Sequence, residues 1–168
     1  KTDGRANANI GEGTPLPNAA ATRNLNRFPG AAPFQGTQRR SYAAIDLGTN
    51  NCRLLIARPS HDGFIVVDAF SRVVRLGEGL AATGRISDEA MDRAVAALSI
   101  CADKLKRRNV ALARSVATEA CRRASNGTRF IDRVKRETGI LLDVISAEEE
   151  ARLAVLGCHV LLEPGESN

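Results

Sequence analysis

Three short segments of the chain contain the residue types that phosphate chemistry requires. In the first, Asp46 ends an apolar stretch and is followed closely by Gly48, Thr49, Asn50 and Asn51. A turn of this composition offers backbone N–H groups and amides to an anion, and the carboxylate at its edge can hold a metal ion or order a water molecule. The same composition is common in ordinary hairpin turns. These residues alone leave a phosphate site and a plain turn equally open.

The other two segments each begin a predicted helix directly after a predicted strand. Residues 118–123 (T-E-A-C-R-R) place Arg122 one turn into a helix, where a guanidinium can bind phosphate oxygens beside the free N–H groups of the helix start. Residues 146–152 (S-A-E-E-E-A-R) put three carboxylates in a first turn, where one could serve as the base for an attacking water. Taken alone, Arg122 and Arg123 also fit a solvated helix face, and the carboxylates also fit the helix dipole.

The histidines and cysteines indicate neither a covalent nucleophile nor a zinc site. His61 lies in a predicted turn and His159 in a predicted helix, and neither has a Ser or Cys partner at a recognisable spacing. The cysteines are Cys52, Cys101, Cys121 and Cys158. They are widely spaced without a C-x-x-C pair, so we expect buried, reduced thiols. Attack of water on a phosphoryl group, by contrast, needs only positioning, a base and cations.

Composition predicts one domain preceded by a basic tail. The chain has 168 residues and a formal net charge of +5, and residues 1–40 alone contain six basic and two acidic residues. These forty residues are rich in Gly, Pro, Asn and Ala and lack hydrophobic periodicity, so we predict a disordered tail over 1–40 and a domain over 41–168. The nearly neutral remainder argues against a specific nucleic-acid partner. No stretch approaches the roughly 20 apolar residues of a membrane span, and reduced cysteines suit the cytoplasm.

The predicted elements place all three segments at strand ends. We predict strands over 42–47, 52–58, 64–72, 110–117 and 140–145. We predict helices over 87–107, 118–125, 126–139 and 146–161, with Ser87, Thr118 and Ser146 as caps. Three strands joined by short turns form an antiparallel meander, and helices lead to the later strands, so the fold class is α/β with a mixed sheet. In open sheets of this class, ligands bind at such strand ends.

Four blocks follow one another between about residues 42 and 158. They read A-A-I-D-L-G-T-N-N-C-R-L-L-I, V-R-L-G-E-G-L, V-A-T-E-A-C-R-R-A-S-N and V-I-S-A-E-E-E-A-R-L-A-V-L-G. In order and spacing the chain resembles the exopolyphosphatase / guanosine pentaphosphate phosphatase family of the actin–sugar kinase–Hsp70 superfamily. Four ordered blocks are much more specific than any one of them. The resemblance implies a ribonuclease-H-like (actin-like ATPase) subdomain whose first hairpin binds phosphate.

The resemblance also implies roles for individual residues. It assigns phosphate binding to Asp46, Gly48, Thr49, Asn50 and Arg122, by motif position. It implies that Glu150, the residue directly before Ala-Arg-Leu, orients or deprotonates water in the hydrolysis of a terminal phosphoanhydride. Asp46 would also help to place a Mg²⁺ ion. The implied substrates are polyphosphate or guanosine pentaphosphate, and the full-length protein is expected to be a homodimer.

The chain departs from the family pattern in one large respect. A second phosphate loop, D-x-G-G-G-S, is absent from the 168 residues. We therefore expect an N-terminal part that is inactive by itself; the alternative is a non-catalytic module that binds polyphosphate, nucleotide or another anionic partner. A sugar or acetate kinase is disfavoured, because the E-E-E-A-R block belongs to the phosphatase branch. Smaller departures are Asn51 in place of Ser and Ala147 in place of Gly.

The last predicted helix has an apolar face without an assured partner. That face consists of Leu153, Leu156 and Val160. Exposed apolar surface of this kind favours association. We therefore expect the isolated chain to be marginally stable or to self-associate.

Overall fold

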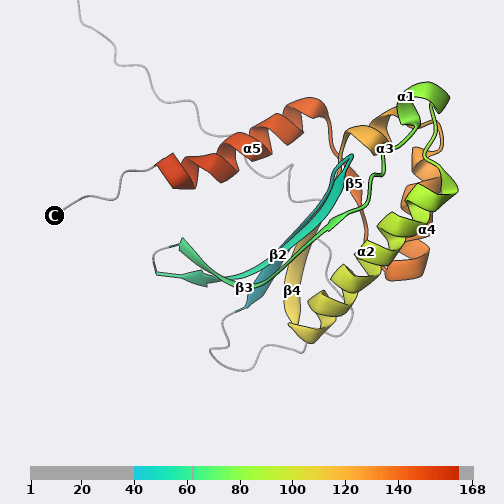
Figure 1. Ribbon diagram of the computed structural model, residues 1–168. Helices are drawn as coiled ribbons and strands as arrows, with labels where there is room; N and C mark the ends of the chain where they lie inside the picture. The colour runs from blue at the N-terminus through green and yellow to red at the C-terminus, as the bar shows by residue number, and fades with distance from the viewer. Residues whose placement is uncertain (1–39, 62, 163–168) are drawn as a thin grey trace, which may run out of the picture.

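The computed structural model describes residues 40–61 and 63–162, with side chains up to residue 157 (Figure 1). The predicted tail over 1–40 therefore lies outside the described residues, apart from Arg40. The predicted turn at residues 61–63 is described except for its central residue.

A five-stranded mixed sheet forms the centre of the fold, in the order β3-β2-β1-β4-β5. Strands β1 and β2, and β2 and β3, pair antiparallel, whereas β1 and β4, and β4 and β5, pair parallel. This is the ribonuclease-H-like arrangement of a meander followed by crossover helices, as predicted. The strands are β1 (Ser41–Leu47), β2 (Asn51–Ser60), β3 (Gly63–Val73), β4 (Val110–Ala117) and β5 (Asp143–Val144).

Five helices connect or follow these strands. They are α1 (Leu80–Thr83), α2 (Asp88–Arg107), α3 (Glu119–Arg123), α4 (Gly127–Thr138) and α5 (Ala147–Leu162). The start of α2 is as predicted, because the Ser87 hydroxyl accepts a hydrogen bond from the Ala90 backbone N–H at 3.2 Å. Ser146 likewise accepts from the Glu149 N–H at 3.2 Å. Among the described residues, no helix combines the length and hydropathy that a membrane span requires.

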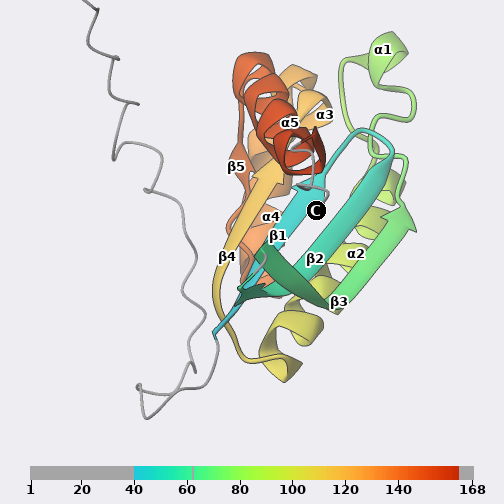
Figure 2. The ribbon, with the colours of Figure 1, turned by 90° about the vertical axis from the view of Figure 1, so that its left-hand side faces the viewer.

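The two faces of the sheet have different surroundings. Alternate residues of β1 and β2, such as Ile45, Leu47 and Ile56, are buried. They belong to one apolar core with α2 and α4, which cover this inner face (Figures 1 and 2). Helix α5 lies on the opposite, outer side of the sheet (Figure 1). On that outer face Tyr42 and Leu55 remain 41% and 38% exposed.

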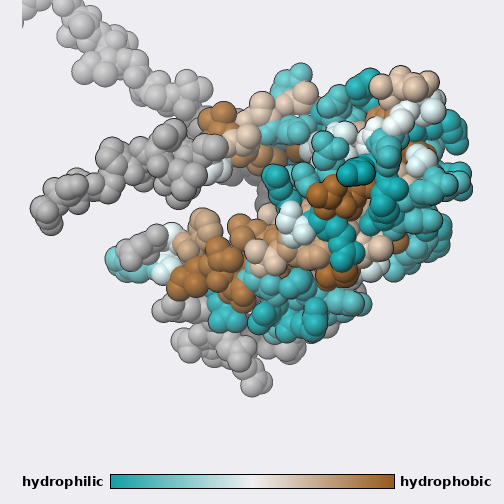
Figure 3. All heavy atoms as spheres, viewed as in Figure 1, coloured by the Kyte–Doolittle hydropathy of each residue, from teal (hydrophilic) through white to brown (hydrophobic). Residues whose placement is uncertain are grey.

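The thiols and the apolar surface largely follow expectation. Buried free thiols are found at Cys52, Cys101 and Cys121, whereas the side chain of Cys158 lies outside the described residues. Leu156 of α5 is 53% exposed. Apolar side chains also gather on the β2–β3 hairpin, at Phe64, Ile65 and Val66 (Figure 3).

Three local predictions differ from the structure. Only Asp143 and Val144 of the predicted strand 140–145 join the sheet, because Ile140 and Leu142 are instead buried in the core. Thr118 occupies the N-cap position of α3 but makes no capping hydrogen bond with its side chain, which is buried. Helix α1 was not predicted, since four residues are too few to show helical periodicity.

Backbone hydrogen bonds from residues 74–77 hold the turn between β1 and β2 in place. The Asn50 carbonyl accepts hydrogen bonds from the backbone N–H groups of Val74 and Arg75, at 2.8 and 3.0 Å, and the Thr49 carbonyl accepts one from Gly77 at 3.0 Å. Gly77 packs so closely on Thr49 that a Cβ atom there would overlap the Thr49 Cγ2 methyl. The glycine of the V-R-L-G block is thus explained by the space that the turn occupies.

An arginine of α2 secures the same segment. The Arg93 side chain donates to the Val74 carbonyl at 2.9 Å, to the Arg75 carbonyl at 3.3 Å and to the Glu78 carboxylate at 2.7 Å. The turn, residues 74–78 and α2 therefore form one connected unit. Its effect is to fix the backbone that follows Asp46.

The edge strand β3 is tied to α2 by an acid between two bases. Asp68 accepts from Lys104 at 2.9 Å and from Arg108 at 3.0 Å, and its side chain is only 13% exposed. The hydrogen bonds from Lys104 and then Arg108 lower the pKa of Asp68 to about 2. A carboxyl group with a lowered pKa stabilises the fold above its ordinary pKa, and this contribution is lost as the pH falls through the lowered value.

Replacement of Asp68 by Asn should remove that pH-dependent contribution. We expect Asp68→Asn to lower the melting temperature at pH 7 by roughly 2–5 °C. Because the native pKa is about 2 and the ordinary value is 3.8, the variant should also lose less stability than the wild type between pH 4 and pH 2. Thermal unfolding followed by circular dichroism checks both, with Asp103→Asn, an exposed acid of α2 outside this cluster, as control. Parallel stability curves for wild type and Asp68→Asn would contradict the assignment.

Contact between Gly77 and Thr49 gives a second prediction. Gly77→Ala should lower the free energy of unfolding by roughly 1–3 kcal/mol, because the new methyl overlaps Thr49. Thr49→Ser deletes the overlapping Cγ2 methyl, so the double variant should recover most of the loss. Urea unfolding of the two single variants and the double variant measures this coupling. Gly157→Ala is the control, since a Cβ there meets open space. Additive effects at the two positions would contradict the proposed contact.

Candidate active site

Strands β1, β4 and β5 end together at one edge of the sheet. Leu47 pairs with Ala117, and Ala117 pairs with Val144. Backbone hydrogen bonds continue just beyond these residues. The Thr118 N–H donates to the Leu47 carbonyl at 3.2 Å, and the Ile145 N–H donates to the Ala117 carbonyl at 3.1 Å. Helices α3 and α5 begin beside this edge (Figure 2). The three segments singled out in the sequence therefore meet in space.

Gly48, Thr49 and Asn50 form the turn at this edge. The turn is closed by a hydrogen bond from the Gly48 N–H to the Asn51 carbonyl at 2.9 Å. Since the Thr49 and Asn50 carbonyls are bound to residues 74–77, the acceptor groups of the turn are engaged away from the predicted phosphate site. The turn is therefore fixed, and the Gly48 N–H is used to close it and is not left for an anion.

Arg122 and Glu150 form an ion pair. Both terminal nitrogens of the Arg122 guanidinium donate to the same oxygen of Glu150, each at 3.1 Å. One of these nitrogens also donates to the Ile145 carbonyl at 2.6 Å. The Arg122 side chain is 24% exposed and that of Glu150 is 45% exposed. Two residues from separate sequence blocks thus contact each other directly at the sheet edge.

The three glutamates of α5 have different partners. Glu149 accepts from Arg152 at 2.7 and 2.9 Å and pairs with Arg114 of β4 at 3.4 Å. Glu148 has a lowered pKa, caused by its own backbone N–H at the helix start and by a hydrogen bond from Ser146. Only Glu150 of the three accepts hydrogen bonds from Arg122, whose charge also contributes to the lowered pKa of Glu148. The geometry therefore separates Glu150 from its neighbours.

Asp46 lies on the outer face of β1, opposite Arg53 of β2. Its pKa is raised above the ordinary value, chiefly by partial removal from water; the positive charge of Arg53 opposes this shift and the negative charge of Glu150 adds to it. Asp46 and Glu150 are thus close enough to interact. The site thus combines two carboxylates with two guanidinium groups, Asp46 opposite Arg53 and Glu150 paired with Arg122.

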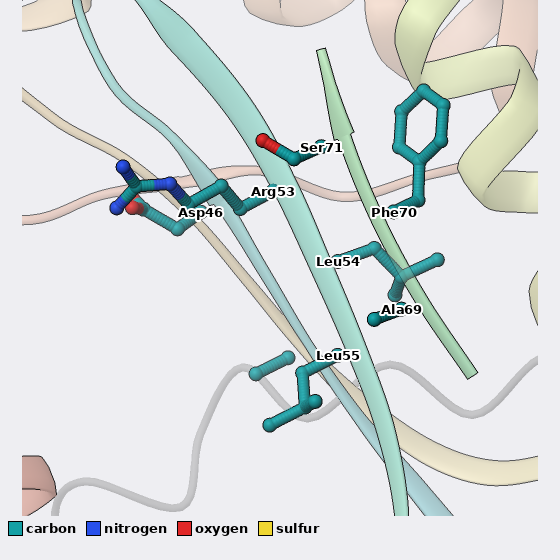
Figure 4. Close-up of a pocket in the computed structure, with 8 residues that line it drawn as sticks. Asp46, Arg53, Leu54, Leu55, Ala69, Phe70 and Ser71 are labelled. Atoms are coloured by element: carbon teal, nitrogen blue, oxygen red, sulfur yellow. The ribbon is translucent and has the colours of Figure 1, made fainter. Parts of the chain in front are cut away.

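Arg53 was not predicted as a site residue. Its guanidinium lies beside the Asp46 carboxylate at one end of a shallow hollow of about 460 Å³ (Figure 4). The hollow continues along the outer face over Leu55 and Ser71. The sequence could have indicated this residue. In an antiparallel hairpin with Leu47 opposite Cys52, Arg53 lies opposite Asp46 on the same face of the sheet.

A magnesium site fits these residues only in company with phosphate. Among the described residues, no group of three or more His, Cys, Asp or Glu side chains could hold a metal ion. Asp46 and Glu150 nevertheless supply two neighbouring carboxylates. Mg²⁺ is commonly bound by one or two carboxylates together with substrate phosphate oxygens. The donor set suits that mode and not an all-protein cage.

Ser125 and Asn126, which end the V-A-T-E-A-C-R-R-A-S-N block, have a structural role. Asn126 is buried, accepts from the Ile86 N–H at 3.0 Å and donates to the Ile86 carbonyl at 2.9 Å. Ser125 donates to the Gly84 carbonyl at 3.1 Å. These bonds tie the α3–α4 connection to the loop before α2. They hold the end of the short helix that bears Arg122.

The chain is similar to several solved structures. It is 32% identical to the Ppx/GppA family member of Aquifex aeolicus, with a TM-score of 0.71 over 76% of this chain and 42% of that one. It is 40% identical to an exopolyphosphatase-like protein, with a TM-score of 0.64 over 68% of this chain and 35% of that one. It is 35% identical to an exopolyphosphatase from Cytophaga hutchinsonii, with a TM-score of 0.65 over 68% of this chain and 36% of that one.

The family assignment follows from these similarities and from one further match. The chain spans about two fifths or less of the length of each of these relatives. The Ppx/GppA phosphatase family model matches residues 55–166, which is more than half of the chain. The chain belongs to the Ppx/GppA phosphatase family.

Proposed function

We propose that this chain is the part of a phosphatase that binds the terminal phosphate and supplies the base, in the hydrolysis of polyphosphate, guanosine pentaphosphate or both. The observation that carries the proposal is the meeting of Arg122, Glu150 and Asp46 at one sheet edge. A guanidinium that can bind phosphate, a carboxylate beside it and a rigid turn are the parts that water attack on a phosphoanhydride needs. The similarity to exopolyphosphatases supports this chemistry.

In the proposed reaction, the terminal phosphate lies against the Gly48–Asn50 turn and the Arg122 guanidinium. Glu150 takes a proton from water as the water oxygen bonds to the terminal phosphorus. The bond from that phosphorus to the bridging oxygen breaks, and the shortened chain leaves with the bonding electrons. Asp46 would hold a Mg²⁺ ion, which supplies positive charge to the phosphate oxygens when bound. Both substrates end in the same phosphoanhydride, so these residues do not discriminate between them.

Mutation of Arg122 tests the proposal in this 168-residue chain. We expect titration calorimetry with tripolyphosphate and Mg²⁺ to detect binding, and Arg122→Gln to abolish it. Arg123→Gln is the matched control, because this exposed neighbour pairs with Glu119 instead. Absence of binding by the wild type, or equal effects of the two substitutions, would contradict the phosphate site.

Turnover gives a separate prediction. We expect no phosphate release from polyphosphate by this chain alone, because no D-x-G-G-G-S loop faces the site from within the 168 residues. In any form of the protein that releases phosphate, Glu150→Gln should slow release by roughly 100-fold or more, the usual contribution of a general base. Glu148→Gln, two positions from Glu150 and without a hydrogen bond to Arg122, should stay within a few-fold. Undiminished release by Glu150→Gln would eliminate Glu150 as the base.

A second candidate function is binding without hydrolysis. It applies to a protein that lacks the second loop altogether, because such a protein could hold a phosphate chain but not complete the site. The gene sequence after residue 168 separates the two candidates. A D-x-G-G-G-S motif within about a dozen codons would support the enzyme, and a stop codon there would support a binding module.

A further inference from the structure

In this structure the two central residues of the proposed site are engaged with each other. Both terminal nitrogens of Arg122 are directed at one oxygen of Glu150. The proposed reaction needs Arg122 on the terminal phosphate and the Glu150 carboxylate on a water molecule. The donors that Arg122 directs at Glu150 are the same ones that a terminal phosphate would take, so phosphate and carboxylate compete for them. A phosphate that takes both donors releases the engaged oxygen of Glu150.

We propose that the Arg122–Glu150 ion pair is a gate that a terminal phosphate opens, so that substrate binding and release of the base are a single event. This inference rests on the proposed function of the site and adds its regulation. Without a phosphate, the carboxylate stays bound to the guanidinium. With a phosphate, the guanidinium changes partner and the carboxylate becomes available to water.

The contacts of Arg122 indicate that the arginine stays and the glutamate moves. The Ile145 carbonyl holds one Arg122 nitrogen at 2.6 Å, independently of Glu150. Ile145 is itself buried, and its N–H is bound to the Ala117 carbonyl at 3.1 Å. Arg122 is therefore anchored to the sheet edge. Glu150, with a side chain 45% exposed, has room to turn away.

Helix α5 need not move for the gate to open. Its first turn is joined to β4 by the Glu149–Arg114 pair at 3.4 Å, and the helix begins with the Glu150 N–H donating to the Ser146 carbonyl at 3.0 Å. None of these involves the Glu150 carboxylate. The motion is therefore limited to one side chain. Such rotamer changes at partly exposed positions occur within picoseconds to nanoseconds, so the gate would not limit turnover.

A terminal phosphate can compete successfully for the guanidinium. It carries more negative charge than a carboxylate and offers several acceptor oxygens to the two-pronged donor of an arginine. A partly exposed ion pair, in turn, is weak and is broken at modest cost. The gate therefore reduces affinity for phosphate without preventing binding. Removal of the competing carboxylate should restore the lost affinity.

Titration calorimetry with tripolyphosphate measures this competition in the 168-residue chain, in buffer without divalent cations. We expect Glu150→Gln to bind roughly two- to fivefold more tightly than the wild type, from the strength of partly exposed ion pairs. Glu149→Gln is the matched control: it removes the same charge one residue earlier, from a side chain paired with Arg114 and Arg152. It should change affinity less than twofold. Thermal unfolding verifies that each variant is folded.

The outcomes separate the gate from the phosphate site itself. Tighter binding by Glu150→Gln alone supports the gate. Equal tightening by both substitutions indicates a general charge effect and overturns the gate, as does equal affinity of wild type and Glu150→Gln; in both cases the phosphate site stands. No binding by wild type and both variants overturns the gate together with the proposed function.

A measurement on the wild type tests the gate without any variant. Carbon-detected NMR follows the side-chain carboxyl resonance of Glu150 during titration with tripolyphosphate. We expect this resonance to shift in parallel with saturation, while that of Glu149 stays nearly constant. Saturation of the protein without a shift of the Glu150 carboxyl would overturn the gate and leave the phosphate site intact.

Discussion

The parallel pairing of β4 with β1 is the constraint on which the rest of the site depends. It aligns Leu47 with Ala117, and the pairing of β4 with β5 adds Val144 to the same line. Asp46, Arg122 and Glu150 come from segments far apart in the chain, and this register alone makes them neighbours. Because side chains alternate between faces, a slip of one residue would turn Asp46 into the apolar core. The core packing that fixes the register therefore also fixes the chemistry.

The two faces of the sheet divide structural and chemical roles between them. The inner face is apolar and continuous with α2 and α4, and it stabilises the register. The outer face presents Asp46, Arg53 and Arg114 toward the side where α5 lies. Ion pairs to Arg114 and Arg122 join the start of α5 to this face. The Glu149–Arg114 pair holds the start of the helix to β4, and the neighbouring Glu150–Arg122 pair places a carboxylate at the site.

Much of the fold could be predicted from local sequence, and most of the rest depended on partners elsewhere. Residues 110–117 were predicted as a strand and form one, because their small and β-branched side chains alternate in burial. The length of strand β5 was overestimated. An apolar run such as 140–145 predicts a strand whether its backbone pairs with a neighbouring strand or its side chains only pack in the core. Thr118 was expected to cap α3, but its side chain is buried instead. Arg53 and Gly77 gain their meaning only from contacts across the hairpin and behind the turn.

The run of three glutamates shows most clearly where sequence reasoning stops. Adjacent residues of a helix point about 100° apart, so Glu148, Glu149 and Glu150 must face different surroundings. Local sequence explains two of them: the helix start satisfies Glu148, and Arg152, three residues on, satisfies Glu149. The partner of Glu150 comes from α3, which places Arg122 within reach. A carboxylate that its own helix leaves without a partner is free to take one from the sheet edge, and at this edge that partner is the residue proposed to bind phosphate.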